Sequence, residues 1–440
     1  MSKKSVRIIT LGCSKNTVDT EHLLGLVQND LEVIPEDADP PYVDYLLLNT
    51  CGFIGDAKEE SVQAVLQAAA LKAQGRVGSL MVFGCLSQRY SAELPSLIPE
   101  VDAWFGAREL APVARALGVE PAAGGAVTRW LPPRGKGYAY LKISEGCDRR
   151  CSYCAIPFIR GAHRSVPIEE LVREAALLAS SGVKELILIA QDTTYYGLDL
   201  YGRRALADLL QSLSAVQGIE WLRVHYSYPA DFPQDVLEQM AVNPKVCKYL
   251  DIPLQHISDR VLDNMHRHID SEKTRSLIRS FREIVPGIVL RTTLIVGHPG
   301  EGEKEFEELL DFVRESRFER LGAFTYSEEE GTYGAEHFAD DVPPEVKQER
   351  LDRLMELQRG ISLDYNRSRV GSEVRVMVDG FIPGPDPESR IAVCRSEFES
   401  PEVDGEILVR GMAPDVKVGD MVRVRITAAE EYDLTGRQIL

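Results

Sequence analysis

The sequence predicts an α/β protein in three parts: an N-terminal open parallel-sheet α/β domain, a central partial (βα)6 barrel and a small C-terminal antiparallel β-barrel. In residues 5–118 and 137–368, short apolar runs alternate with helical patterns, which is typical of parallel βαβ units. From residue 369 to 440, short alternating strands with turn residues replace this pattern, and no helical period is visible. A chain of 440 residues is long enough for each part to bury a core of its own.

Three apolar runs of the N-terminal domain each end at a cysteine. The runs VRIITLGC, DYLLLNTC and SLMVFGC end at Cys13, Cys51 and Cys85, and helical patterns follow the first two. Because the carboxyl ends of parallel strands meet at one edge of a sheet, these cysteines could meet in space although they are far apart in sequence.

The middle of the chain predicts a linker and then a barrel. Residues 119–136 are rich in Pro, Gly and Ala and lack periodicity, which indicates a linker. Six candidate strands follow, namely AYLKIS, ELILIAQD, WLRVHYS, YLDIPLQ, VLRTTLIVG and LGAFTYS, with helical patterns between them. Six such units predict an open barrel whose chemistry lies at the carboxyl ends of its strands. A charged helix at 343–368 leads out of this domain.

Composition narrows the class of protein. Eight cysteines are too sparse for a disulfide scaffold, and no stretch approaches the roughly 18 to 20 apolar residues that span a bilayer. We therefore expect a cytoplasmic protein without membrane association, whose clustered cysteines bind metal. A net charge of -18 opposes non-specific binding to nucleic acid, which rests on Lys and Arg, and suits a basic partner.

Cys147, Cys151 and Cys154 form a CxxxCxxC loop directly after the first predicted strand of the central barrel. A structural zinc site needs four ligands, and the adjacent residues supply no fourth Cys or His, His163 being the nearest candidate. Three thiolates can instead hold three irons of a [4Fe-4S] cluster and leave the fourth iron open to a small molecule. A zinc site and an ordinary four-cysteine electron-transfer cluster are the alternatives.

This loop resembles the signature of the radical S-adenosylmethionine (SAM) superfamily. The resemblance implies that the open iron binds the amino and carboxylate groups of SAM. It also implies that an electron from the cluster cleaves SAM to methionine and a 5′-deoxyadenosyl radical, which abstracts hydrogen from an unreactive C–H bond.

Several other residues are candidates for binding SAM. Polar residues at the carboxyl end of the predicted strand ELILIAQD could hold its amino group or ribose, although capping of the next helix is an equally good interpretation. Two residues lie on the inward face of VLRTTLIVG, and a glycine-rich turn, by itself a weak signal, follows that strand. An aromatic residue of the cysteine loop could stack on adenine or only pack the loop. The expected cofactor-binding set is Tyr153, Gln191, Asp192, Thr193, Gln255, Arg291, Thr293, Gly297 and Glu301. No acid or base is identifiable beyond the cluster ligands.

The runs LGCSKNTVD, NTCGFI and FGCLSQR, followed by the cysteine loop and a small β-barrel, resemble the methylthiotransferase family over nearly the whole chain. That family has an N-terminal domain, a radical SAM barrel and a C-terminal TRAM domain in this order. The resemblance implies that Cys13, Cys51 and Cys85 bind a second [4Fe-4S] cluster, which carries or passes on the inserted sulfur. Without it, buried structural cysteines would be equally plausible. Cys247 and Cys394 match no ligand position of the family.

Within the family, four runs are similar to the branch that modifies an aspartate of a small-subunit ribosomal protein: AQDTTYYGLD, IPFIRGAHRS, IPLQH and FTYSEEEGT. The branch that modifies adenosine in transfer RNA typically carries a GQNVNxY-like run and an RPGT-like run, and this sequence has neither. The resemblance implies that the radical attacks the β-carbon of the aspartate, that a second SAM methylates the sulfur, and that 3-methylthioaspartate forms. It further implies an electron donor such as flavodoxin or ferredoxin. A transfer RNA methylthiotransferase and a non-catalytic iron-sulfur protein are the alternatives.

The charge of the C-terminal domain bears on the same choice. Residues 370–440 carry eight basic and fourteen acidic residues, a balance of -6. A β-barrel that grips a phosphate backbone should be basic, so nucleic acid is not expected as the direct substrate. An acidic barrel suits a basic ribosomal protein, as does the acidic run Glu328, Glu329 and Glu330, although a merely soluble surface is the alternative.

Overall fold

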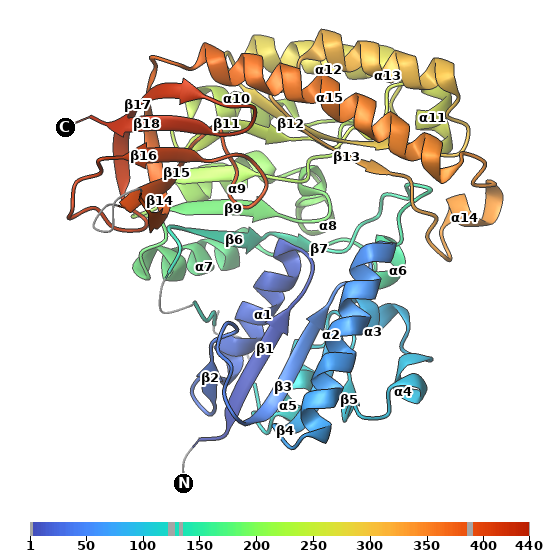
Figure 1. The fold of residues 1–440 in the computed structure, drawn as a ribbon, viewed down its shortest axis with the longest axis vertical. Helices are drawn as coiled ribbons and strands as arrows, with labels where there is room; N and C mark the ends of the chain where they lie inside the picture. Colours follow the sequence, from blue (N-terminus) through green and yellow to red (C-terminus); the bar gives the residue numbers. More distant parts are fainter. Residues whose placement is uncertain (1–2, 122–127, 132–134, 385–389, 440) are drawn as a thin grey trace.

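The computed structural model describes residues 3–121, 128–131, 135–384 and 390–439, so that parts of the predicted linker (122–127 and 132–134) lie outside the described residues. Residues 3–121 form an α/β domain with the parallel sheet order β2-β1-β3-β4-β5 (Figure 1). Apolar residues of α1 and α5 cover one face of this sheet, and those of α2 and α4 cover the other. The elements are β1 (Ser5–Thr10), α1 (Ser14–Val27), β2 (Glu32–Ile34), β3 (Val43–Thr50), α2 (Gly55–Ala73), β4 (Val77–Gly84), α3 (Cys85–Arg89), α4 (Leu94–Leu97), β5 (Ala103–Trp104) and α5 (Leu110–Ala116).

The three predicted strands of this domain are its central strands β1, β3 and β4. They read as nearly continuous apolar runs because helices cover the sheet on both sides. The edge strands β2 and β5 contain three and two residues, too few for a periodic pattern, and sequence analysis missed them.

The central domain is the predicted open barrel of six parallel strands, in the order β13-β12-β11-β10-β9-β6. Along β9, Leu186 and Leu188 pack against the outer helices, whereas Ile187 and Ile189 face the lumen. The strands are β6 (Tyr138–Lys142), β9 (Glu185–Ile189), β10 (Trp221–Val224), β11 (Val246–Asp251), β12 (Val289–Val296) and β13 (Arg320–Thr325), beside a short pair β7 (Ser144–Glu145) and β8 (Arg164–Ser165). The helices are α6 (Ile156–Arg160), α7 (Ile168–Ser180), η1 (Thr193–Tyr195), α8 (Leu198–Tyr201), α9 (Leu206–Ser214), α10 (Gln234–Val242), α11 (Asp259–Asn264), α12 (Ser271–Ile284), α13 (Glu303–Ser316), α14 (Tyr333–His337) and α15 (Pro344–Ser368).

The C-terminal domain is a closed five-stranded barrel in the order β14-β15-β16-β18-β17 around an apolar core. The expectation of an antiparallel barrel needs one correction: β16 and β18 pair in parallel, because the chain crosses over through β17 before β18. Sequence analysis also missed β18, whose sequence LTGRQ shows no apolar alternation. The strands are β14 (Glu373–Pro383), β15 (Arg390–Ser396), β16 (Ile407–Arg410), β17 (Met421–Ala429) and β18 (Leu434–Gln438).

The loop between β15 and β16 packs into the base of the central barrel. Glu399 pairs with Arg320 and with Arg369 at the end of α15. The Ser400 hydroxyl lies 2.9 Å from Nε2 of His225, and Asp404 accepts a hydrogen bond of 2.7 Å from the Tyr249 hydroxyl. These two carboxylates are interdomain contacts, so they do not contribute to an acidic surface for a basic partner.

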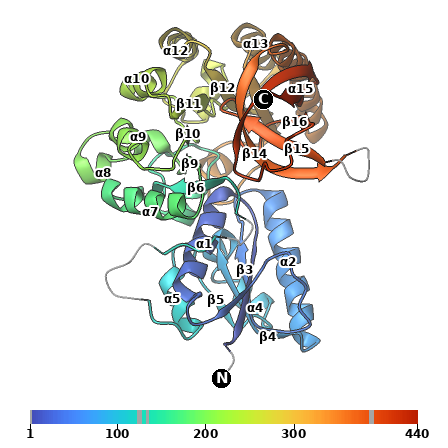
Figure 2. The same cartoon turned by 90° about the vertical axis from the view of Figure 1, so that its left-hand side faces the viewer.

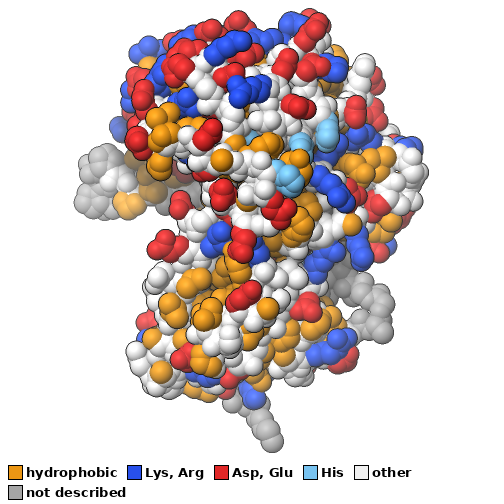
Figure 3. Space-filling view, turned by 90° about the vertical axis from the view of Figure 1, so that its right-hand side faces the viewer, with side chains coloured by type: hydrophobic (Ala, Val, Ile, Leu, Met, Phe, Trp, Pro, Cys, Tyr) orange, Lys and Arg blue, Asp and Glu red, His pale blue; other side chains and the backbone are white. Residues whose placement is uncertain are grey.

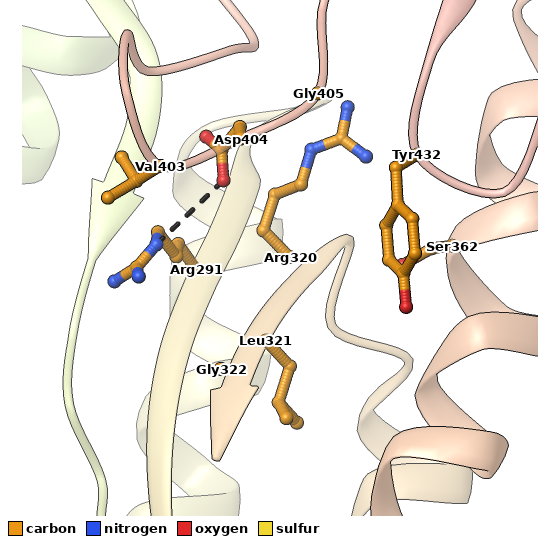
Figure 4. Close-up of a pocket in the computed structure, with 9 residues that line it drawn as sticks. All are labelled: Arg291, Arg320, Leu321, Gly322, Ser362, Val403, Asp404, Gly405 and Tyr432. Atoms are coloured by element: carbon orange, nitrogen blue, oxygen red, sulfur yellow. Dashed lines mark ion pairs between the residues drawn. The ribbon is translucent and has the colours of Figure 1, made fainter. Parts of the chain in front are cut away.

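A cavity of about 290 Å³ lies beside this loop. Figure 4 shows Arg291 of β12 beside Asp404, and Arg320 of β13 extending into the space between Gly405 and Tyr432. Both arginines stand near the amino ends of their strands. The cavity is therefore at the opposite end of the barrel from the expected site of chemistry.

Replacing Glu399 should separate the two domains more easily. Glu399→Gln would leave Arg320 and Arg369 buried without their counter-charge, which costs about 3 to 5 kcal/mol for a buried ion pair. We expect a lower midpoint of thermal unfolding and faster proteolysis in residues 396–406. The control is Glu373→Gln, since Glu373 pairs with Arg423 and Arg425 on the surface and its loss should leave both readouts unchanged. Equal effects of the two substitutions would contradict this assignment.

The N-terminal domain packs against the first strand of the central barrel. Helix α1 contacts β6, and Figure 2 shows the two elements side by side where the domains meet. Arg129, in the described part of the predicted linker, is buried between α1 and α7 and donates to Glu21 (2.7 Å) and Glu174 (2.6 Å). This linker segment therefore ties the two domains together. Within the described residues, no helix is both long and apolar enough to cross a membrane.

Candidate iron-sulfur and SAM site

The first cysteine set lies in the loop between β7 and α6, at the carboxyl edge of the barrel. The backbone N–H of Cys147 donates to the carbonyl of Gly161 (3.0 Å), and that of Cys154 donates to the carbonyl of Cys151 (3.1 Å). Gly146 begins the loop with a φ of +80°, and a Cβ there would lie 2.2 Å from the carbonyl oxygen of Ala162. Only glycine fits this position, so the loop is fixed by its own backbone.

The three cysteines of this loop are half-buried. Burial raises the pKa of Cys147 to about 12 and raises the pKa of Cys154 further, and negative charge on Cys151 adds to both shifts. Cys147 and Cys154 are therefore neutral thiols at pH 7 and would release their protons on binding iron. Among the described residues, no three His, Cys, Asp or Glu side chains are grouped as ligands of a single metal ion. In a cluster each cysteine binds a different iron, so its ligands stand further apart than the ligands of one ion.

Two arginines that sequence analysis missed flank this set. Nη1 of Arg267 lies 3.4 Å from Sγ of Cys151 and 3.4 Å from the Tyr153 hydroxyl, so Arg267 holds the one aromatic residue of the loop. Arg149 donates through Nε to Asp192 (2.9 Å), and its guanidinium stacks 4.0 Å from the ring of Tyr228. Arg267 stacks 4.3 Å from the same ring. No spacing in the sequence connects Arg267 with the cysteines.

Three of the expected SAM-binding residues carry a buried oxygen without a hydrogen bond from the described residues: Gln191, Gln255 and Glu301, whose Oε2 only faces His256. Oε1 of Gln191 and Oε1 of Gln255 are buried and accept no hydrogen bond from any described residue. Gln255 adopts a φ of +75°, which is rare for a residue other than glycine, and its backbone is held by Thr293 (2.9 Å) and Ile295 (2.8 Å). Buried polar atoms are normally paired. Oε1 of Gln191 and Oε1 of Gln255 can therefore each accept a hydrogen bond from a bound ligand.

The other expected residues are engaged with protein. Asp192 caps η1 through the backbone N–H of Thr194 (2.9 Å), which is the capping interpretation, and the Thr193 hydroxyl donates to the His225 carbonyl (2.9 Å). A Cβ at Gly297 would lie 2.3 Å from Cγ of Lys347, so close packing against α15 explains this glycine.

The two charged candidates are also paired. Glu301 accepts from Arg350 (2.9 Å) and faces His256 (3.2 Å). Arg291 does lie on the inward face of β12, but it donates to Asp251 (2.7 Å) near the base of the barrel. These two side chains therefore have protein partners where the sequence suggested a ligand.

The second cysteine set lies at the carboxyl edge of the N-terminal sheet, as the alternation predicted. Cys13 precedes α1, Cys51 follows β3, and Cys85 is the first residue of α3. A Cβ at Gly12 would lie 2.7 Å from Cβ of Cys51 and 3.0 Å from its sulfur, so only glycine lets these two loops approach each other.

Asn16 joins all three loops of this second set. Its buried Nδ2 donates to the carbonyls of Leu11 (2.8 Å) and Thr50 (3.3 Å), and its Oδ1 lies 3.9 Å from Sγ of Cys85. Burial raises the pKa of Cys85 to about 11 and also raises the pKa of Cys51, and negative charge on Cys13 adds to both shifts. The loops of the three cysteines are therefore neighbours at this edge of the sheet.

The two cysteine sets are neighbours. Cys85 packs directly against Ala155 and Ile159, and Ala155 follows Cys154 in the first loop. A small molecule or sulfur bound by one set can therefore lie close to the other.

One residue of the acidic run Glu328, Glu329 and Glu330 forms ion pairs with the N-terminal domain. Glu329 is buried and pairs with Lys58 of α2 (2.8 Å) and Arg89 of α3 (2.8 Å). Figure 3 shows the side of the molecule that carries α14 and α6, over which acidic and basic side chains are both spread. Charge alone therefore does not select a partner for this face.

The chain matches known families along most of its length. Residues 141–313 match the radical SAM superfamily, residues 5–106 match uncharacterized protein family UPF0004, and residues 370–439 match the TRAM domain. The ribosomal protein uS12 methylthiotransferase RimO of Bacteroides fragilis is 48% identical, over 100% of both chains. RimO of Flavobacterium johnsoniae is 50% identical, over 99% of this chain and 98% of its own.

Solved structures share the fold. The radical SAM methyltransferase TsrM of Kitasatospora setae, solved with cobalamin and a [4Fe-4S] cluster, has a TM-score of 0.53 at 14% identity and covers 76% of this chain and 78% of its own. The cobalamin-dependent radical SAM enzyme OxsB, solved with aqua-cobalamin and SAM, has a TM-score of 0.51 at 14% identity, over 82% and 56% of the two chains. At this identity the likeness describes the fold alone.

Proposed function

The chain belongs to the RimO family of ribosomal protein uS12 methylthiotransferases, and we propose that it inserts a methylthio group at the β-carbon of an aspartate of uS12, giving 3-methylthioaspartate. Relatives 48% identical over their full length support the choice of substrate. The observation that carries the proposal is the contact between Cys85 and Ala155, because it brings a second cysteine set against the SAM loop. In the net reaction a C–H bond becomes a C–S bond, the hydrogen leaves in 5′-deoxyadenosine, and a second SAM supplies the methyl group.

Both cysteine sets suit [4Fe-4S] clusters, since each brings three thiols to one edge of a sheet: Cys51 and Cys85 are buried, Cys147, Cys151 and Cys154 are half-buried, and Cys13 is exposed. Cys147, Cys151 and Cys154 would hold the cluster that binds SAM, and Cys13, Cys51 and Cys85 would hold the one that carries sulfur. When bound, the first cluster supplies the electron that cleaves SAM. A small electron carrier such as flavodoxin or ferredoxin would deliver that electron, and a ribosomal substrate would place the reaction in the cytoplasm.

The chain's own residues bind and orient SAM. The free acceptors of Gln191 and Gln255 would receive hydrogen bonds from SAM, whose amino group is a donor. Tyr153, held by Arg267, closes one side of this space next to Cys154. The guanidinium groups of Arg149 and Arg267, stacked on Tyr228, bring positive charge to the carboxylate side of SAM and help to exclude water.

Gln255→Ala should weaken SAM binding. Loss of one hydrogen bond to a charged group costs about 1.5 to 3 kcal/mol, so the Kd for SAM should rise by about tenfold or more. Equilibrium dialysis with the cluster-loaded protein measures this change. Gln234→Ala, on the exposed first turn of α10, is the control and should leave the Kd unchanged. An unchanged Kd in Gln255→Ala would remove Gln255 from the SAM site.

The proposed activity is tested with the full-length protein, reconstituted with iron and sulfide and supplied with SAM and a reductant. Mass spectrometry of uS12 should find one aspartate-containing peptide carrying a methylthio group, and transfer RNA in a parallel reaction should be unchanged. Methylthiolated adenosine in transfer RNA with unmodified uS12 would overturn the choice of substrate. Absence of 5′-deoxyadenosine would overturn the assignment of radical SAM chemistry.

A further inference from the structure

One buried arginine connects the two cysteine sets. Arg160 is the last residue of α6, the short helix that follows Cys154, and only 2% of it is exposed. Its side chain extends out of the radical SAM loop and into the N-terminal domain, where its partners lie on α1 and α3. It lies in the run IPFIRGAHRS, but nothing in that run indicates its contact with a cysteine of the N-terminal domain.

Every nitrogen of the Arg160 guanidinium group donates a hydrogen bond. Nε donates to Sγ of Cys85 (3.2 Å), and Nη2 donates to Oδ1 of Asn16 (2.6 Å), the residue that joins the second cysteine set. Nη1 donates to Asp19 (2.7 Å) and to Glu145 (3.1 Å). A planar fork is required to reach these partners in different directions, which the single ammonium of lysine does not provide.

Glu145 connects Arg160 with Gln191, one of the expected SAM-binding residues. Oε1 of Glu145 accepts a hydrogen bond of 2.7 Å from Nε2 of Gln191, whose own Oε1 has no partner among the described residues. Lys142 pairs with both Asp19 and Glu145. An unbroken hydrogen-bonded path therefore runs from the sulfur of Cys85 through Arg160 and Glu145 to Gln191.

We propose that Arg160 is a positioning residue that fixes the sulfur-carrying site against the SAM site and, through its N–H···S hydrogen bond to Cys85, raises the reduction potential of the cluster held there. This inference rests on the proposed function for the identity of the two clusters. Hydrogen bonds and positive charge at a cluster sulfur favour the reduced, more negative state. The shared path lets a displacement at one site change the geometry of the other.

A second interdomain arginine provides the matched control. Arg89 lies at the other end of α3 from Cys85, is half-buried, and pairs with Glu329 (2.8 Å), but none of its hydrogen bonds reaches a sulfur. Losing Arg89 weakens the domain contact as losing Arg160 does. Only Arg160 should change the cluster itself.

The first test uses the full chain with Cys147, Cys151 and Cys154 replaced by alanine, so that only the second site is loaded. A redox titration followed by electron paramagnetic resonance measures its midpoint potential. In this background Arg160→Gln should shift the potential to a more negative value, Arg160→Lys should shift it less, and Arg89→Gln should leave it unchanged. A potential unchanged in both Arg160 variants, or an equal shift in Arg89→Gln, overturns the proposal. If Arg160→Gln does not fold, Arg160→Lys decides in the same way.

The second test uses the chain with all cysteines intact and compares two products. Arg160→Gln should keep SAM cleavage, because Lys142 still holds Glu145 and Glu145 still accepts from Gln191. Methylthiolated uS12 formed per 5′-deoxyadenosine should fall by about tenfold or more, the usual effect of losing a residue that orients a metal ligand. A proportional loss of both products would reduce Arg160 to a structural role. If the parent chain cleaves SAM without modifying uS12, the proposed function is wrong. The midpoint potentials of the Arg160 variants would still test whether Arg160 affects the second cluster.

Discussion

A Cys151→Ala variant of the full-length protein is expected to form 5′-deoxyadenosine only at the background of the iron-free protein. Cys151 is the middle residue of the first loop, and no described side chain beside it offers a replacement ligand: its neighbour Arg267 is a cation and donates to the sulfur. With one of two clusters lost, bound iron should fall by about half. Anaerobic reconstitution, iron analysis and chromatography of the nucleoside product measure both effects.

Cys247→Ala is the matched control for this substitution. Cys247 is buried between Trp221, Tyr249 and Val289 on the lumen side of the barrel and belongs to neither cysteine set. Its loss should leave the iron content and SAM cleavage intact, at most with a small loss of stability from the cavity. SAM cleavage by Cys151→Ala at the parent rate would refute the ligand assignment of the first loop.

Cys85→Ala is expected to have the opposite profile, with SAM cleavage retained and methylthiolated uS12 absent. Cys85 contributes its sulfur to the second set, and its neighbours Ala155, Ile159 and Arg160 are not ligands of the first set, so the first set keeps its three thiols. Bound iron should again fall by about half. Cys394→Ala, in the core of the C-terminal barrel, is the control and should keep both products.

Either of two results would contradict the division of roles between the sets. Methylthiolated uS12 formed by Cys85→Ala at the parent rate would remove the second set from the reaction. Complete loss of SAM cleavage in Cys85→Ala would mean that the two sets do not hold separate clusters.

Much of the architecture was predictable because regular burial leaves a pattern in the sequence. The strands β3 and β9 are covered on both faces and read as apolar runs, and every cysteine of the second set follows such a run. Edge strands of two or three residues and the Gly-containing β18 leave no such pattern. The parallel pairing of β16 with β18 depends on a crossover that no local signal encodes.

The contacts around the site were less predictable because they join residues far apart in sequence. Arg160 and Arg267 are single arginines in ordinary surroundings, and only the fold brings each to a cysteine sulfur. The carboxylates of Glu399 and Asp404 have the composition of a solvated surface, but the loop that carries them is packed into the barrel. The close packing of Gly297 against Lys347 is likewise visible only in the fold, and the role of this glycine in binding SAM stays a prediction.

The account is tested most directly by mass spectrometry of ribosomal proteins from cells with and without this gene. Methylthiolation adds a fixed mass to one peptide, so the comparison does not depend on reconstituting the clusters. We expect an aspartate of uS12 to carry the modification only when the gene is present, and a gene encoding Cys85→Ala to behave like its absence. Unmodified uS12 in both strains, together with a change in transfer RNA, would contradict the account.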